Sequence, residues 1–141
     1  MSIFKTRYTA EQLNSVNTGN LGAALGIQIT EIGEDFVRGT MPVDQRTRQP
    51  YGLLHGGASV ALAESLGSLG GGLTVDPEKF SVVGIEINAN HLKGKRDGMV
   101  TGTARALHLG RSTQVWEIRI VDEADALVCI SRLTLAVVPK K

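Results

Sequence analysis

Hydrophobic residues recur at helical spacing in one stretch near the middle of the chain. Four leucines follow one another at spacings of four, three and four residues: Leu62, Leu66, Leu69 and Leu73. This spacing predicts a helix from Gly56 to about Leu73, with the leucines on one narrow stripe. The opposite side carries mostly small residues: Gly57, Val60, Ala61, Glu64, Ser68 and Gly71. Because apolar or small residues surround the helix nearly completely, we expect it to be buried and wrapped by other structure.

The chain after Pro77 has the composition of β-strands. Segments rich in Val, Ile, Thr and Leu predict strands over residues 81–92, 99–109, 112–122 and 127–138. The connectors at 93–98, 110–111 and 123–126 are short and contain turn-forming residues. Short connectors predict that consecutive strands are antiparallel neighbours.

Three shorter elements are predicted before the central helix. Thr9 and Gln12 have the spacing of a capping box, which predicts a short helix that ends near residues 17–20. Strand-like residues 26–31 and 36–43 are separated by a turn-like Gly33-Glu34-Asp35 segment and predict a hairpin. The polar residues 44–51 then predict a loop that leads to the central helix.

The order of these elements predicts the fold class. A helix, a hairpin, one glycine-rich helix and four strands indicate an α+β domain whose antiparallel sheet curls around the central helix. Small residues on that helix would let the sheet approach closely. A length of 141 residues with 42% hydrophobic content suits one core, so we expect a single domain over residues 1–141.

Composition narrows the classes of partner. Fifteen Lys and Arg against fourteen Asp and Glu give a formal charge of +1, which provides no attraction to nucleic acid or to an anionic membrane. We therefore expect small-molecule ligands and copies of the same chain as partners. The only cysteine, Cys129, lies in an apolar run and is expected to be a buried thiol. Without an apolar leader or a run of 18 apolar residues, the chain is expected to be soluble and cytoplasmic.

Candidate chemistry gathers where the polar loop meets the central helix. At His55-Gly56-Gly57, backbone N–H groups at the helix start should be unpaired and lie at the positive end of the helix dipole. Glycine also lacks the Cβ that would keep a substrate carbonyl away. These features predict a site that binds an oxyanion.

A carboxylate lies two turns further along the helix. Glu64 and Ser68 are four residues apart on the small-residue side, so their side chains can share one pocket. The apolar neighbours of Glu64 leave no evident solvent face, so we expect it to be buried rather than a solvated surface residue. A carboxylate there can attack a carbonyl carbon or activate water.

Simpler readings of the same residues stay open. His55 can be a helix cap or a packing residue, and Ser68 can be a small core filler. The three histidines, His55, His91 and His108, lack the spacing of a zinc site, so no metal is expected.

The segment from Gln49 to Ser59, joined to Ala63-Glu64-Ser65, resembles the signature of hotdog-fold acyl-CoA thioesterases. A glutamine six residues before His55 and a glutamate nine residues after it make the match specific. The closest branch contains the 4-hydroxybenzoyl-CoA, 1,4-dihydroxy-2-naphthoyl-CoA and enterobactin-proofreading thioesterases. Residues 88–91, 107–110 and 115–116 also look like family segments, so the resemblance covers most of the chain.

The resemblance implies a hotdog fold and hydrolysis of an acyl- or aroyl-CoA thioester to a free acid and coenzyme A. Glu64 would be the nucleophile or general base, while the Gly56 N–H and Gln49 would polarise the thioester carbonyl. His55 would assist positioning or protonate the leaving group, and Ser68 would hold the water. No cofactor is implied, since coenzyme A is part of the substrate.

The resemblance also implies a substrate-binding set and an assembly. His91 would line the acyl or aryl end, and Gly57 would lie beside the thioester. The turn Gly110-Arg111-Ser112-Thr113 resembles the one that contacts the nucleotide of coenzyme A, and nearby basic residues could face its phosphates: Lys93, Lys95, Arg96 and Arg105. Each pocket would lie at a dimer interface, with Glu64 and Gln49 from different subunits, and a dimer of dimers would be the usual tetramer.

Two other functions are compatible with the same fold. One is a hydratase or dehydratase acting on a thioester, which the spacing from His55 to Glu64 disfavours. The other is a non-catalytic acyl-CoA-binding module, which would normally accompany a DNA-binding segment that the sequence lacks. The sequence does not fix the acyl group or decide between coenzyme A and an acyl- or aryl-carrier protein as its carrier.

Overall fold

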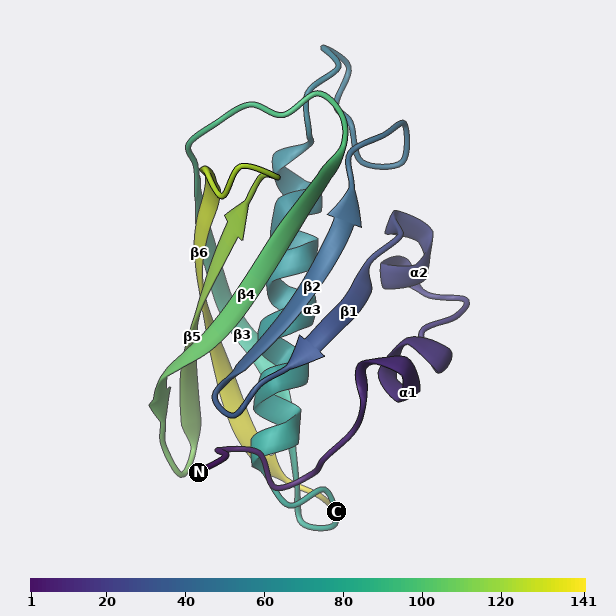
Figure 1. The fold of residues 1–141 in the computed structure, drawn as a ribbon. Coiled ribbons are helices and arrows are strands. Elements are labelled where there is room, and N and C mark those ends of the chain that lie inside the picture. The colour runs from purple at the N-terminus through teal and green to yellow at the C-terminus, as the bar shows by residue number, and fades with distance from the viewer.

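A computed structural model describes all residues, 1–141, and consists of one curled sheet around one long helix (Figure 1). The helices are α1 (Ala10–Ser15), α2 (Leu21–Leu25) and α3 (Gly56–Thr74). The strands are β1 (Gln28–Ile32), β2 (Phe36–Pro42), β3 (Phe80–His91), β4 (Met99–Leu109), β5 (Thr113–Val121) and β6 (Leu127–Pro139). They form one antiparallel sheet in the order β1-β2-β4-β5-β6-β3. The predicted α+β hotdog architecture is confirmed.

Glycines let the sheet close tightly on α3. A Cβ added at Gly70 would lie 2.8 Å from the Trp116 ring, and one at Gly67 would lie 2.6 Å from Leu133 Cδ2. On the other side of the helix, Leu66 occupies the space that a side chain at Gly39 or at Gly102 would need. The predicted close approach between small helical residues and the sheet is therefore present on the buried part of α3.

This packing predicts opposite effects of alanine at two helical glycines, Gly70 and Gly72, which are two residues apart. Gly70→Ala should lower the free energy of unfolding by about 1–3 kcal/mol, because the new methyl group meets the rigid Trp116 ring. Gly72→Ala should raise it by about 0.5–1 kcal/mol, because the nearest atom would be 4.0 Å away and alanine favours the helix. Urea unfolding at one protein concentration measures both. Equal effects of the two substitutions would contradict the packing described here.

The structure confirms only part of the prediction for the N-terminal elements. Thr9 and Gln12 form the predicted capping box, in which Thr9 Oγ1 accepts from Gln12 N at 3.1 Å and Gln12 Oε1 accepts from Thr9 N at 2.9 Å. Helix α2 was not predicted. It begins after the N-cap Asn20 and ends at Gly26, whose φ of 77° lies in the left-handed region. The predicted strand at 26–31 accordingly starts two residues later, at Gln28.

One predicted strand pairing is wrong. Strands β3 and β4 are not neighbours, because β3 pairs with β6 and β4 pairs with β2. The β4–β5 and β5–β6 pairings are as predicted. The connector at 92–98 crosses the end of the sheet between the two halves of the curl (Figure 1). A segment of this length can span roughly 3.3–3.6 Å per residue, so a short connector does not require a hairpin when the sheet is strongly curved.

The buried side-chain polar groups of the core all have hydrogen-bond partners, and the N-terminal segment covers the last turn of α3. Cys129 is fully buried as predicted, and burial raises the pKa of its thiol. Trp116 Nε1 donates to Gln114 Oε1, and Gln114 Nε2 donates to Thr74 Oγ1, each at 2.9 Å. The N-terminal segment closes the last turn of α3, where the Leu73 carbonyl accepts from the backbone N–H groups of residues 5 and 6.

None of the three helices has the length and hydropathy needed to cross a membrane.

Candidate active site

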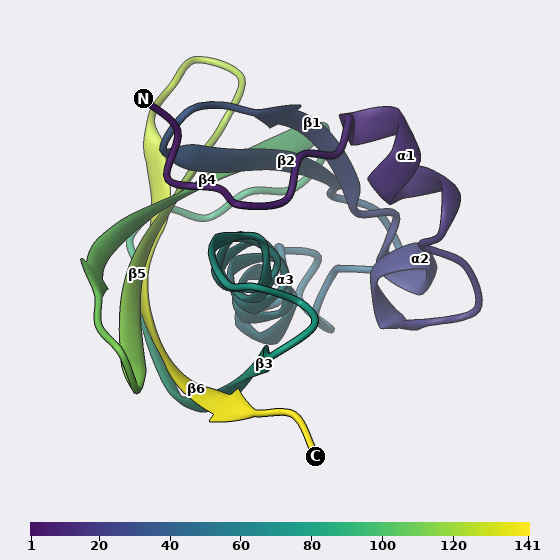
Figure 2. The ribbon, with the colours of Figure 1, turned by 90° about the horizontal axis from the view of Figure 1, so that it is seen from below.

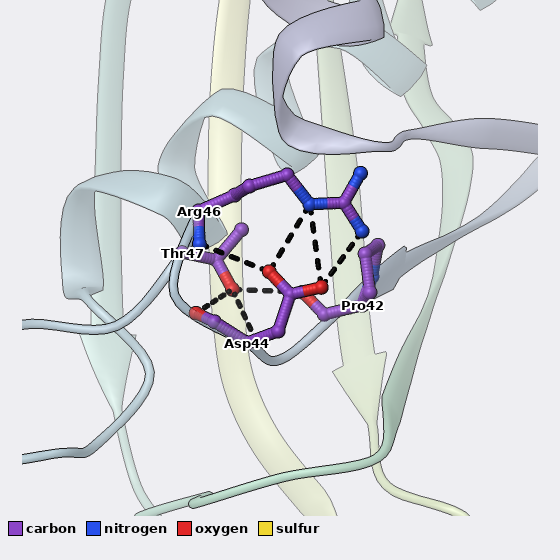
Figure 3. A network of polar contacts seen from close by, with 4 residues as sticks. All are labelled: Pro42, Asp44, Arg46 and Thr47. Carbon is purple, nitrogen blue, oxygen red and sulfur yellow. Dashed lines mark hydrogen bonds and ion pairs between the residues drawn. The ribbon is translucent and has the colours of Figure 1, made fainter.

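A network of polar contacts fixes the loop that leads into α3 (Figure 3). The buried Thr47 hydroxyl donates to the Pro42 carbonyl at 2.8 Å and accepts from Asp44 N at 3.1 Å. Arg46 Nη2 pairs with Asp44 Oδ2 at 2.7 Å, and the hydrogen bond from Arg46 lowers the pKa of that carboxyl. The Thr47 carbonyl then accepts from His55 N at 2.7 Å. This network fixes the start of the loop at Thr47 and ties it to its end at His55.

Gln49 is held in a tight turn within this loop. Its backbone N–H donates to the Leu53 carbonyl at 2.8 Å, and its carbonyl accepts from Gly52 N at 2.9 Å. Its side-chain oxygen accepts from Tyr51 N. The side-chain nitrogen has no partner within the chain, so this amide can donate a hydrogen bond to a ligand.

The start of α3 leaves one backbone donor free. His55 is the N-cap, and its Nδ1 accepts from Gly57 N at 2.8 Å. The His55 carbonyl accepts from Ala58 N at 3.0 Å. The Gly56 N–H has no partner within the chain and lies at the positive end of the helix dipole. His55 thus has the capping role that the sequence left open, and the predicted oxyanion donor narrows to Gly56 alone.

A pocket of about 370 Å³ brings three predicted residues together. It contains Gln49 from the loop, Gly56 from the helix start and His91 from the end of β3. His91 lies so close to the helix that a Cβ added at Gly56 would be 2.8 Å from its Nε2. The remaining lining residues are Leu53, Leu54, Ser59, Leu92, Lys93, Gly94 and Val128. We call this space the helix-start pocket.

Glu64 and Ser68 lie on a face of α3 that the sheet leaves open. The sheet curves round the helix from β1 to β3, and no element of the chain lies between α2 and β3 (Figure 2). The expectation that Glu64 is buried is therefore wrong: it is half-buried, as is Ser68, and its neighbour Ser65 is exposed. The Glu64 carboxylate lies against Gly84 of β3 and forms none of the six ion pairs. Helical spacing showed which residues share a face but not which element covers it.

Within one chain, Glu64 and the helix-start pocket do not converge. Gly56 and Glu64 are eight residues apart on α3, which places them about 12 Å apart along the helix axis. Reacting groups must come within roughly 3–3.5 Å of each other. Neither Glu64 nor Ser68 lines the helix-start pocket. The Gly56 N–H and the Glu64 carboxylate therefore do not face a common pocket within a single chain.

The turn at residues 110–113 lies at the other end of α3. Gly110 N donates to the Thr113 carbonyl at 2.8 Å and closes the hairpin between β4 and β5. Gly110 and Arg111 line a separate pocket of about 230 Å³ beside Thr74, while Ser112 and Thr113 are exposed. Since α3 has 19 residues, this turn is about 27 Å from Gly56 along the helix. Any contact with a ligand in the helix-start pocket would have to come from another chain.

Three of the four basic residues suggested for phosphate binding are already paired. Lys93 pairs with Asp122, and Lys95 Nζ lies 2.6 Å from Glu123 Oε1. Arg105 Nη1 lies 2.9 Å from Asp35 Oδ1. The Arg96 side chain forms no ion pair and donates to the Tyr51 carbonyl, while the Arg96 carbonyl accepts from Arg48 Nε at 2.8 Å. Lys93, Lys95 and Arg96 thus hold the connector and the loop beside the helix-start pocket, whereas Arg105 lies away from it.

Comparison with known proteins decides the family. The thioesterase superfamily matches residues 51–129, which include the end of the loop before α3, then α3, β3, β4, β5 and the start of β6. The 1,4-dihydroxy-2-naphthoyl-CoA hydrolase of Escherichia coli is 53% identical over 135 residues, covering 96% of this chain and 98% of the relative. This chain belongs to the thioesterase superfamily.

Other relatives of this thioesterase carry related names. The proofreading thioesterase EntH of Cronobacter turicensis is 51% identical over 135 residues, covering 96% of this chain and 98% of the relative. A crystal structure of a thioesterase from Haemophilus influenzae superposes with a TM-score of 0.94 at 50% identity, covering 97% of this chain and 95% of that chain. The predicted resemblance to hotdog thioesterases and the predicted class of enzyme, a thioester hydrolase, are confirmed.

Another pocket of the thioesterase, beside the N-terminal helices, was not predicted from the sequence. It has a volume of about 430 Å³ and lies between α1, α2 and the open face of α3. Its lining is mainly apolar: Leu13, Val16, Leu21, Ile27, Ile29 and Leu69, with Asn17, Asn20, Gly22 and Ser65. We call it the apolar pocket. Asn20, the N-cap of α2, and Gly26, its C-cap, were the sequence signals that could have predicted α2. They could therefore also have predicted the part of the pocket lining that α2 supplies.

Proposed function

We propose that this thioesterase hydrolyses an aroyl- or acyl-CoA thioester to the free acid and coenzyme A. One observation carries the proposal: the unpaired Gly56 N–H at the start of α3 shares a pocket with the Gln49 side chain. Two hydrogen-bond donors aimed at one point are what a thioester oxygen needs as it gains negative charge. The names of the relatives at about half identity support a coenzyme A thioester as the substrate.

The reaction assigns a role to each residue. The thioester oxygen accepts from the Gly56 N–H and from Gln49 Nε2, which polarise the carbonyl. The Glu64 carboxylate attacks the carbonyl carbon or removes a proton from the attacking water, and Ser68, one turn beyond, holds that water. The C–S bond breaks, and coenzyme A leaves as the thiolate and takes up a proton. The second oxygen of the free acid comes from water when Glu64 activates water, and from the Glu64 carboxylate, which water then restores, when Glu64 attacks directly. His55, with Nδ1 engaged at the cap, can present only Nε2 to the leaving group.

Two chains form each site in this proposal. β3 is an edge strand of the sheet, and its exposed Val83 and Ile85 flank Gly84, against which Glu64 lies. A long edge strand with exposed apolar side chains is a surface that pairs with another strand. Pairing two copies through β3 covers these side chains and brings the helix-start pocket of one chain toward Glu64 of the other. The dimer is therefore the smallest active unit, and a dimer of dimers can supply the turn at 110–113 from a further chain.

The apolar pocket suits the acyl part of the substrate. Ser65 and Leu69 of its lining each lie next to a proposed catalytic residue on α3, Glu64 and Ser68 respectively. Burial of an aromatic or aliphatic acyl group there would contribute about 25 cal/mol per Å² of apolar surface. In this proposal the acyl group lies in the apolar pocket, and the thioester carbon extends from it over the open face of α3 toward Glu64.

A panel of thioesters tests this function. Thiol release should be fastest with hydroxynaphthoyl- or benzoyl-CoA, slower with medium-chain acyl-CoA, and detectable with the same aroyl group on an aryl-carrier protein. Leu69→Asn, which places a polar side chain in the apolar pocket, should raise KM for the best substrate several-fold without changing cleavage of acetyl-CoA. Absence of thiol release from every thioester in the panel would refute the proposed function.

A further inference from the structure

One wall of the helix-start pocket is the connector between β3 and β4. Residues 91–94 line the pocket, and the rest of the connector runs to Gly98. The Val128 carbonyl of β6 accepts from Leu92 N at 2.8 Å, and the Lys95 carbonyl accepts from Leu54 N at 2.7 Å. The connector therefore touches both the sheet and the loop that carries Gln49.

Two carboxylates on the β5–β6 turn hold this connector. Asp122 Oδ1 accepts from Ala124 N and Ala126 N at 2.9 and 3.0 Å, while Oδ2 pairs with Lys93. Glu123 Oε1 pairs with Lys95, and its Oε2 accepts from Met99 N at 3.0 Å. Each carboxylate thus binds one lysine of the connector and at least one backbone N–H.

These two ion pairs differ from the others in the chain. In each, one partner is nearly buried: the Asp122 side chain is 7% exposed beside Lys93, and the Lys95 side chain is 12% exposed beside Glu123. In every other ion pair both side chains are at least 30% exposed. Exposed pairs contribute little to stability, whereas a nearly buried charge keeps its partner in one place because losing that partner is costly.

The pairing also makes both carboxylates strongly acidic. The hydrogen bond from Lys93 lowers the pKa of Asp122 to about 2, and the hydrogen bond from Lys95 lowers the pKa of Glu123 to about 2. A lowered pKa in the folded state means that the stabilisation is complete above the unfolded value near 4 and is lost as pH falls toward 2. The connector is therefore held at any pH at which a thioesterase is assayed.

We propose that Asp122 and Glu123 are positioning residues, which hold the connector so that His91 stays against Gly56 and the pocket keeps its shape. The proposal rests on the proposed function only in taking Gly56 as the donor to the thioester oxygen. Catalysis by preorganised donors is sensitive to small displacements, since a shift of roughly 1 Å can cost about 100-fold in rate. Release of one lysine would let the connector move away from the helix start.

The variant Asp122→Asn tests this role. Asparagine still accepts from Ala124 N and Ala126 N through its side-chain oxygen but no longer attracts Lys93. We expect kcat/KM to fall between about 10-fold and about 100-fold, mainly through kcat, since the proposed oxyanion interaction strengthens in the transition state. The double variant with Lys93→Met should be no worse than the poorer single variant, because both remove one interaction. Glu31→Gln, which breaks the exposed pair with Arg38, serves as the matched control and should leave kcat/KM unchanged.

A spectroscopic readout separates positioning from general destabilisation. The chain has three histidines, so the imidazole NMR signals of His91 and His108 can be followed individually. Asp122→Asn should shift the His91 signals and leave those of His108, beside Gly110 at the far end of α3, in place. If Asp122→Asn folds poorly, Glu123→Gln at the more exposed pair gives the same test.

Unchanged His91 signals together with unchanged kcat/KM in Asp122→Asn would overturn the proposal, and so would additive effects of Asp122→Asn and Lys93→Met. If the unaltered protein cleaves no thioester, the proposed function fails. The histidine spectra then still decide whether the carboxylates position the pocket wall, so the two failures are distinguishable.

Discussion

Glu64→Gln should lower kcat by at least about 10²-fold while leaving the fold and the assembly intact. Loss of a positioned general base costs about 10²–10⁴-fold, and loss of a nucleophile would cost more. The half-buried Glu64 forms no ion pair, so its replacement leaves no partner unsatisfied. Thermal unfolding and size-exclusion chromatography should therefore match those of the unaltered protein.

A matched control separates the role of Glu64 from the mere loss of a negative charge. Glu78 is exposed in the turn after α3 and forms no ion pair, so Glu78→Gln removes the same charge without touching the site. Its kcat should equal that of the unaltered protein. Full activity in Glu64→Ala would exclude Glu64 from the chemistry.

Direct attack by Glu64 and activation of water by Glu64 both predict the loss of kcat in Glu64→Gln. Single-turnover hydrolysis in ¹⁸O-labelled water distinguishes them. Direct attack forms an anhydride with the enzyme and puts label first into the protein carboxylate, whereas activation of water puts it only into the released acid.

Local features of the fold were predictable because they depend on neighbouring residues. The capping box of Thr9 and Gln12 and the limits of α3 follow from contacts within a few positions, and both agree with the structure. The five residues of α2 are too few for a periodic pattern to emerge. The place of β3 beside β6 depends on long-range pairing, which the length of a connector does not encode.

In the candidate site, too, some features were predictable from the sequence and others depended on long-range packing. The sequence placed Gln49, Gly56 and His91 in one set, and the structure brings them into one pocket. The exposure of Glu64 was not predictable, because it depends on where the curled sheet stops. The free Gly56 N–H follows from a cap whose geometry the sequence left open: His55 Nδ1 accepts from Gly57 and not from Gly56.

If two chains share each site, mixing two inactive variants should restore activity. Gln49→Ala removes one donor to the thioester oxygen and should lower kcat by about 10²–10³-fold, while Glu64→Ala removes the attacking group. In a dimer formed from one chain of each variant, one site keeps both Gln49 and Glu64, and the other site loses both. Random mixing gives such dimers about half of the time, so about one quarter of the unaltered activity should return.

Co-expression of Gln49→Ala and Glu64→Ala chains carrying different affinity tags, followed by purification through both tags, measures this directly. The isolated mixed dimer should hydrolyse the best thioester of the panel at about half the rate of the unaltered protein per dimer, although each variant alone is nearly inactive. A mixed dimer no more active than the two parent variants would show that Gln49 and Glu64 act within one chain, and would contradict the shared site.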